Sequence, residues 1–210
     1  MASILQKNIS KEEQFLQYLQ SDNKEALSFF LNNLHITDVV ELVNQYPEHE
    51  AIILANMSMH RAIHVFKILD ITQQKDIVKT LPVSKTAELL NELPPDDRTA
   101  FLSELPNATI RDLIKLLNQE ERKITLSLLG YPEDSVGRLM TPDYVYVYEH
   151  NSIEEVFATI RKYAKNSETI DVIYVINQNG ELLDDIRIKD ILLASPATLV
   201  SEIMDGRVIT

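Results

Sequence analysis

"LPPDDRTAFLSELP", residues 93–106, begins and ends with Leu-Pro, and its two leucines, Leu93 and Leu105, lie twelve residues apart. The same spacing continues on both sides of the stretch, and each leucine of the series precedes a residue that ends or caps a helix. The pairs are Leu69/Asp70, Leu81/Pro82, Leu93/Pro94, Leu105/Pro106, Leu117/Asn118 and Leu129/Gly130. Six units in register indicate an internal repeat.

The repeat predicts a series of short helices rather than one long helix. Proline fits the first turn of a helix but costs about 3 kcal/mol inside one, so Pro82, Pro94 and Pro106 mark helix starts. Helices of about two and a half turns are not stable alone and must stack on one another. Residues 1–130 are therefore expected to form an α-solenoid of short antiparallel helices with a curved face available to a partner.

The composition excludes several classes of function. The 210 residues carry a formal net charge of -12, which disfavours nucleic acid and anionic membrane surfaces and indicates a cation, a basic partner or simple solubility. There is no cysteine, so disulfides, thiolate metal sites and thiol nucleophiles are excluded.

His60 and His64 have metal-ligand spacing, but "HRAIH" lacks the glutamate of the zinc-protease motif and no third ligand is evident. No nucleophile–base pair stands out either, so we expect no enzymatic activity.

After Gly130 the pattern becomes that of a small α+β unit. Residues 141–148 alternate and are rich in β-formers, whereas residues 152–164 have the period of an amphipathic helix. Asn179-Gly180 is a hairpin turn signal. The expected order is β-α-β-β-α, with strands at 141–148, 169–176 and 185–188 and helices at 152–164 and 189–193.

A second self-similarity lies at the edges of this unit. "VGRLMTPDYV", residues 136–145, and "VSEIMDGRVI", residues 200–209, match at an offset of 64 residues. The offset is the length of one β-α-β-β-α unit. Residues 199–210 are therefore expected to begin a second copy that is cut short here. Either the chain is a piece of a longer protein, which we prefer, or another chain completes the copy.

Five stretches in this order resemble the cytoplasmic region of the MgtE-type magnesium transporters. They are "YPEDSVGRLMTPDYV" (131–145), "SIEEVFATIR" (152–161), "VIYVINQNGELL" (172–183), "IKDILLA" (188–194) and "VSEIM" (200–204). The resemblance implies a helical superhelix over residues 1–130, a CBS domain over 131–198 and the start of a second, truncated CBS repeat at 199–210. In that family a membrane domain follows.

The resemblance also implies a function. It predicts a homodimer, paired through its CBS units, that senses Mg²⁺ on the cytoplasmic side of the cell membrane. Mg²⁺ between acidic faces of the superhelix and the CBS units would favour the closed state of the membrane pore domain. The alternative is a soluble dimeric scaffold, in which the solenoid binds a protein and the CBS unit only dimerises.

The candidate Mg²⁺ ligands are carboxylates at helix starts and on exposed faces. Mg²⁺ keeps several waters and takes one or two carboxylates, so it suits a site shared between two acidic surfaces. The candidates are Glu88, Asp96, Asp97, Glu120 and Glu121 in the solenoid, and Asp171, Asp184 and Asp185 in the CBS unit.

CBS domains commonly end in a motif that binds adenosine nucleotides through a ribose-contacting aspartate. Here the motif reads "DDIRIKD", residues 184–190, in which Asp190 keeps the acidic position. Asp184 replaces the usual glycine and Arg187 the usual hydroxyl residue. Two adjacent carboxylates disfavour an anionic ligand, so the sequence disfavours nucleotide binding at Asp190.

Overall fold

The computed structural model describes residues 10–21, 23–164, 167 and 169–206, and it divides into two compact units. The boundary falls between Leu139 and Met140. We call the first part the helical unit and the second the mixed unit. The predicted boundary at Gly130 lies before the last short helix of the helical unit, α11 (Val136–Leu139), which packs on α8 and α10.

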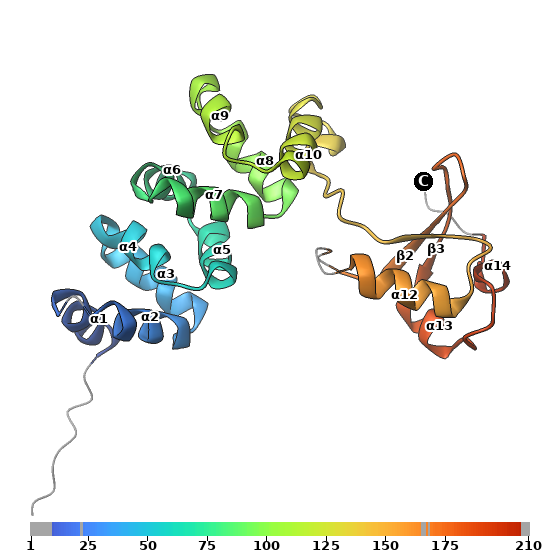
Figure 1. The fold of residues 1–210 in the computed structure, drawn as a ribbon, viewed down its shortest axis with the longest axis horizontal. Helices are drawn as coiled ribbons and strands as arrows, with labels where there is room; N and C mark the ends of the chain where they lie inside the picture. The colour runs from blue at the N-terminus through green and yellow to red at the C-terminus, as the bar shows by residue number, and fades with distance from the viewer. Residues whose placement is uncertain (1–9, 22, 165–166, 168, 207–210) are drawn as a thin grey trace, which may run out of the picture. The chain divides into compact units, whose positions relative to one another are not determined.

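The helical unit is a succession of short helices, which Figure 1 shows stacked in chain order from α1 to α10. Their bounds are α1 Lys11–Gln20, α2 Lys24–Asn33, α3 Ile36–Gln45, the 3-10 turn Pro47–His49, α4 Glu50–Ala55, α5 Met59–Ile68, α6 Ile71–Thr80, α7 Val83–Glu92, α8 Pro95–Ser103, α9 Asn107–Ile114 and α10 Gln119–Leu129. Alternate helices pack together, α3 on α5, α5 on α7, α4 on α6 and α8 on α10. The predicted solenoid of short helices is confirmed.

Leucines and prolines of the series define several of the helix ends. Leu69, Leu81 and Leu93 are extended C-caps of α5, α6 and α7, and all three are buried in the core. The prolines differ from the prediction by one residue. Pro82 and Pro94 are N-caps, and Pro95 occupies the first helical position of α8. An N-cap keeps an extended backbone while its carbonyl accepts the first helical hydrogen bond, and a proline satisfies both conditions.

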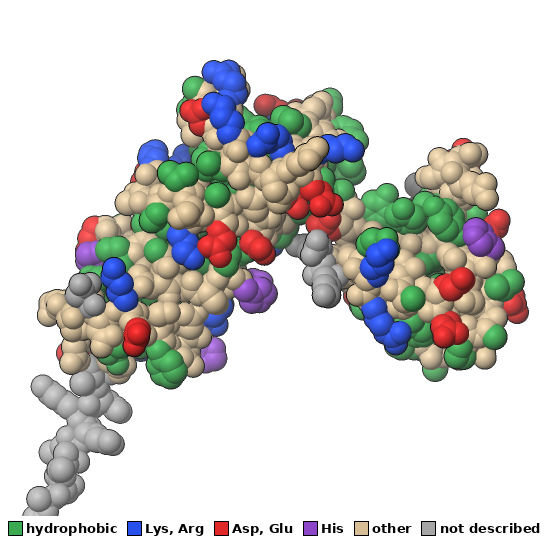
Figure 2. Space-filling view, in the orientation of Figure 1, with side chains coloured by type: hydrophobic (Ala, Val, Ile, Leu, Met, Phe, Trp, Pro, Cys, Tyr) green, Lys and Arg blue, Asp and Glu red, His purple; other side chains and the backbone are tan. Residues whose placement is uncertain are grey.

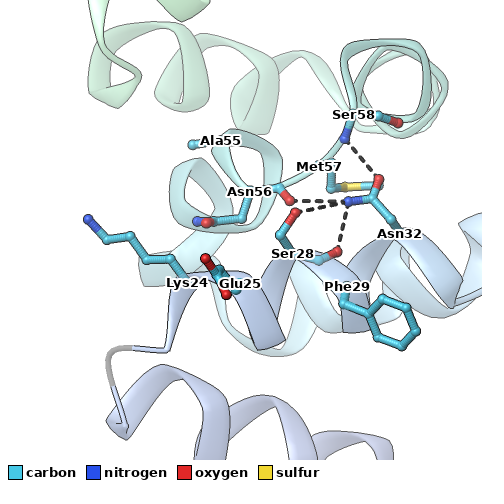
Figure 3. A pocket seen from close by; sticks show the side chains of 9 residues that line it. All are labelled: Lys24, Glu25, Ser28, Phe29, Asn32, Ala55, Asn56, Met57 and Ser58. Atoms are coloured by element: carbon cyan, nitrogen blue, oxygen red, sulfur yellow. Dashed lines mark hydrogen bonds between the residues drawn. The ribbon is translucent and has the colours of Figure 1, made fainter.

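Two asparagines show a longer repeat within the solenoid. Asn32 of α2 binds the loop before α5, donating from Nδ2 to the Asn56 carbonyl (3.3 Å) and accepting the Ser58 N–H (2.8 Å), as Figure 3 shows. Asn91 of α7 does the same to the loop before α10, through the Leu116 carbonyl (3.1 Å) and the Asn118 N–H (2.8 Å).

Asn32 and Asn91 are 59 residues apart, which is close to five twelve-residue units. We call α2 to α5 the first segment and α7 to α10 the second segment. Burial agrees with this register, because Leu42 and Val43 of α3 correspond to Phe101 and Leu102 of α8, and all four are buried.

The mixed unit has the predicted order of elements. It contains β1 (Tyr146–Tyr148), α12 (Ile153–Tyr163), β2 (Val172–Ile176), β3 (Leu182–Arg187), α13 (Ile188–Leu193) and α14 (Val200–Ile203). The sheet order is β1-β2-β3, with β1 parallel and β3 antiparallel to β2. β1 is shorter than predicted because the backbone turns at residues 142–144, where the Tyr144 N–H donates to the Pro142 carbonyl (3.0 Å).

The predicted hairpin turn joins β2 to β3. The Asn177 side chain accepts the N–H groups of Asn179 and Glu181 (both 2.9 Å), and Gly180 has a φ of +82°, which glycine adopts without strain. One face of the sheet buries Val147, Ile173 and Ile186 in the core of the mixed unit, whereas Tyr174 lies exposed on the other face.

The two copies of the second self-similarity both begin with a four-residue helix. α11 starts at Val136 and α14 at Val200, and a methionine, Met140 or Met204, follows each helix. Val200 is buried in the mixed unit, whereas Val136 is 83% exposed. The rest of the second copy, at residues 207–210, lies outside the described residues.

Candidate functional sites

The strongest candidate in the helical unit is the start of α8. Asp96 and Asp97 occupy its first turn, where the helix dipole favours negative charge. Asp97 forms an ion pair with Lys67 of α5, with 2.6 Å between Oδ2 and Nζ, and both side chains are about one-third exposed or less (33% and 28%). The pair lies in a cleft of about 280 Å³ between α5, α6 and α8, which Glu104 also lines. The cleft therefore presents carboxylates together with a lysine that partly neutralises them.

The other three solenoid candidates lie in different surroundings. Glu88 is exposed and pairs with Lys85 one turn away (2.9 Å). Glu120 is exposed at the start of α10. Glu121 accepts a hydrogen bond from Arg98, whose side chain is fully buried. A cation at Glu121 would have to compete with that buried guanidinium.

In the mixed unit the candidates are again unlike one another. Asp171, Asp185 and Asp190 are exposed, Asp185 on β3 opposite Tyr174 and Asp190 in the first turn of α13. Asp184 is fully buried. Its carboxylate accepts the N–H groups of Asp185 (2.9 Å), Asp205 (3.0 Å) and Gly206 (3.0 Å), so it ties β3 to the backbone after α14.

A cavity lies on the exposed face of the sheet, and no sequence pattern indicated it. It measures about 530 Å³, and Tyr144, Tyr174, Asp171 and Thr141 are among its lining residues. The rings of Tyr144 and Tyr174 meet edge to face, with their centroids 5.7 Å apart. The alternation of residues 141–148 predicted a strand. It did not predict a cavity, because the loop residues that complete it are distant in sequence.

Carboxylates are exposed on both units, as Figure 2 shows in red among basic and apolar side chains. Within the described part of the chain, no three Asp, Glu or His side chains are grouped as a metal-binding cluster. In the same residues no helix has the length and apolar character needed to cross a bilayer.

Comparison with known proteins agrees with the resemblance seen in the sequence. Residues 34–134 match the family described as the MgtE intracellular N domain, and residues 136–197 match the CBS domain. A crystal structure described as the cytosolic domain of the Mg²⁺ channel MgtE in complex with ATP superposes with a TM-score of 0.88 at 33% identity, covering 94% of this chain and 82% of that one. The chain belongs to the MgtE family.

It corresponds to the cytosolic domain of MgtE. The magnesium transporter MgtE of Thermus thermophilus is 35% identical over 195 residues, which cover 91% of this chain. The aligned region is 43% of that relative, so the chain spans less than half of its length. The soluble part of another magnesium transporter, at 23% identity, has the same fold with a TM-score of 0.79, covering 96% of this chain and 81% of that one.

Proposed function

We propose that this chain is a magnesium-sensing regulatory region, in which Mg²⁺ bound between acidic surfaces of the helical unit and the CBS domain favours the closed pore of a MgtE transporter. The observation that carries the proposal is the MgtE N domain followed directly by a CBS domain in a chain of net charge -12. Exposed carboxylates in both units supply the chemistry that such a mechanism needs.

Without a cation, two acidic surfaces repel each other and their contact costs free energy. Mg²⁺ offsets this cost, and because it retains several waters it needs only one or two carboxylates in all. Mg²⁺ then shifts an existing equilibrium between joined and separated units. The size of the shift is set by how much more tightly Mg²⁺ binds the joined arrangement than the separated one. The affinity of such hydrated sites is expected to be modest, which suits sensing of an abundant ion.

The contacts divide the candidate ligands into two groups. We propose Glu88, Asp96, Asp97 and Glu120 in the helical unit, and Asp171 and Asp185 in the CBS domain, as the carboxylates that meet Mg²⁺. Asp184 and Glu121 are already held by backbone N–H groups and by Arg98, and we assign them to the stability of the fold.

The proposal includes a homodimer through the CBS units and the membrane pore domain as the partner that the rearrangement controls. The exposed face of the three-stranded sheet carries Tyr144, Tyr146 and Tyr174, with exposures of 53%, 43% and 38%. Open apolar sheet faces of this kind are commonly covered by another sheet.

A second candidate function is adenosine nucleotide binding in the 530 Å³ cavity of the mixed unit. The solved MgtE cytosolic domain with ATP and the two tyrosine rings in the cavity favour it, since aromatic rings stack on bases. Asp171 on the cavity wall and Asp185 nearby on the same sheet face disfavour phosphates. Calorimetric titration with adenosine, ADP and ATP tests it, because repulsion by these carboxylates predicts the tightest binding for the least charged ligand.

The experiment for the main proposal is small-angle scattering combined with sedimentation, titrated with Mg²⁺ against KCl of matched ionic strength. We expect a compaction that Mg²⁺ produces and KCl does not. Asp96→Asn with Asp97→Asn should weaken it. Asp112→Asn, at an exposed carboxylate paired only with its helix neighbour Lys115 (2.7 Å), should not. A chain with the same dimensions at every Mg²⁺ concentration would overturn the proposal and favour the scaffold alternative.

A further inference from the structure

α5 presents two histidines on its exposed side. Its buried residues are Ala62, Val65 and Phe66, and His60 and His64 are exposed on the opposite surface. Their ring centroids are 4.7 Å apart and the rings are nearly perpendicular, at 86°. The two imidazoles are thus already adjacent on neighbouring turns of one helix.

The other three histidines of the chain have separate surroundings. His35 is the N-cap of α3, His49 lies against Phe15, and His150 stacks on Tyr148 with 5.5 Å between ring centroids. Of the five histidines, only His60 and His64 share a helix face.

Two imidazoles four residues apart on a helix have the spacing of a bidentate metal ligand. Imidazole nitrogen suits Zn²⁺, Ni²⁺ and Cu²⁺, whereas Mg²⁺ requires oxygen ligands. The chain has no cysteine, so no thiolate competes for such ions. A helix that holds both ligands in place also increases the local concentration of the second one once the first has bound.

We propose that His60 and His64 together bind one borderline divalent cation of the Zn²⁺, Ni²⁺ or Cu²⁺ class, with water at the remaining coordination positions. This site is chemically distinct from the carboxylates proposed for Mg²⁺ and independent of them. Through this site the helical unit responds to cations of this class. Mg²⁺ does not produce the same response. By joining the first two turns of α5, the bound ion also stabilises that helix.

The test is calorimetric titration of the untagged chain with Ni²⁺, repeated with Mg²⁺. We expect one saturable Ni²⁺ site that Mg²⁺ does not occupy, and weaker Ni²⁺ binding at low pH because protons compete for imidazole. His60→Ala and His64→Ala should each weaken Ni²⁺ binding about tenfold or more, because each removes one of two tethered ligands. His150→Ala is the matched control and should bind as the unchanged chain does.

A further variant tests whether the spacing is what matters. Ile68 is 59% exposed and lies four residues after His64. His60→Ala combined with Ile68→His moves the four-residue spacing one turn along the helix and should restore the binding that His60→Ala loses. Ni²⁺ binding should also raise the melting temperature of the unchanged chain but not of His60→Ala. No saturable Ni²⁺ binding, or binding that both single substitutions leave unchanged, would overturn the proposal.

Discussion

In both segments of the solenoid an arginine donates to the carbonyls at the end of the first helix, but the arginine lies on a different helix in each segment. In the first segment, Arg61 of α5 donates to the carbonyls of Leu31 and Leu34 at the end of α2. In the second segment, the corresponding carbonyls of Leu90 and Leu93 at the end of α7 are bound by Arg98 of α8, at 3.0 and 3.1 Å. The carbonyls at a helix end need a hydrogen-bond donor. The two segments show that equivalent carbonyls can take this donor from helices that are not equivalent.

The surrounding residues change together with the arginine. The position of Arg98 is held in the first segment by Val39, and both side chains are fully buried. In α5 and α10 the offset is 60 rather than 59, because their N-caps, Ser58 and Asn118, are 60 residues apart. The position of Arg61 is therefore held in the second segment by Glu121, which pairs with Arg98. Thr125, which accepts from Arg98 Nε at 2.8 Å, corresponds to Val65. The first core therefore has valine at two of these positions, whereas the second has a buried arginine that pairs with a partly buried glutamate.

The largest effect is expected from removing the buried arginine. Arg98→Met leaves Glu121 without its partner and the Leu90 and Leu93 carbonyls without a donor. Each buried carbonyl left without a donor costs about 1–3 kcal/mol, so we expect a loss of about 2–6 kcal/mol in the free energy of unfolding, measured by urea denaturation followed by circular dichroism. Arg61→Met, at a half-buried residue, should cost less.

A triple substitution should recover stability that Arg98→Met loses. Arg98→Val, Glu121→Arg and Thr125→Val together give the second segment the residues of the first. If the segments are interchangeable, this triple variant should regain more than half of the stability lost in Arg98→Met. A triple variant no more stable than Arg98→Met would show that the two arrangements depend on different backbones.

The next effect concerns what the segments have in common. Asn32→Ala and Asn91→Ala each remove both hydrogen bonds to a loop 24–27 residues away, leaving loop groups without partners. We expect each to cost about 1–3 kcal/mol, and the two costs to be similar. Amide hydrogen exchange at Ser58 and Asn118 should show the loss locally. If only one substitution is destabilising, the two bridges are not equivalent.

The twelve-residue leucine series predicted the solenoid because three of its leucines, Leu69, Leu81 and Leu93, are both core residues and C-caps, so one pattern reports burial and helix length together. The 59-residue repeat left no such pattern. The longer repeat is recognised by two equivalent asparagines and by an arginine that lies on a different helix in each segment. Only the contacts of these side chains identify them. A sequence period indicates which positions are buried, but it does not indicate which side chain satisfies a particular carbonyl.

The candidate sites show the same limit. Exposed carboxylates such as Glu120 and Asp171 lie where the sequence placed them. Asp184 and Glu121 look the same in sequence, yet both are held by donors from distant residues, Asp205 and Gly206 in one case and Arg98 in the other. Only tertiary contacts separate a carboxylate that is available to a cation from one that stabilises the fold.

A smaller effect should separate two ion pairs that occupy equivalent places. Asp38 of the first segment pairs with Lys11 (2.7 Å) and Asp97 of the second with Lys67 (2.6 Å). Lys11→Met and Lys67→Met should each lower the free energy of unfolding by about 1 kcal/mol or less, because partly exposed pairs contribute little.

The Mg²⁺ response should distinguish these two variants. Lys67→Met removes a competitor of the cation at Asp97, so compaction should begin at a lower Mg²⁺ concentration, whereas Lys11→Met should leave the midpoint unchanged. Equal midpoints would remove Asp97 from the proposed Mg²⁺ ligands.

The smallest effect is a pH dependence that belongs to the first segment alone. Glu50 at the start of α4 is 7% exposed, and burial, followed by the nearby carboxylates of Asp76 and Asp70, raises its pKa above 4.5. Its counterpart in the second segment, 59 residues later, is Thr109, which carries no charge. A carboxyl whose pKa is raised by folding favours the folded state while it is protonated, and this contribution is lost as the pH rises through the folded-state pKa.

Glu50→Gln should therefore be slightly more stable than the unchanged chain at pH 7, and the difference should shrink as the pH falls through the raised folded-state pKa of Glu50, where this carboxyl becomes protonated. Urea denaturation from pH 4 to pH 8 measures it. The control is Glu48→Gln, at a side chain that is 61% exposed. Asp38 titrates in the opposite sense, because its hydrogen bond to Lys11 lowers its pKa, so its contribution is lost as the pH falls through that lowered pKa. A Glu50→Gln variant whose stability follows that of the unchanged chain at every pH would mean that Glu50 is hydrated in solution, and that the first segment tolerates its charge without cost.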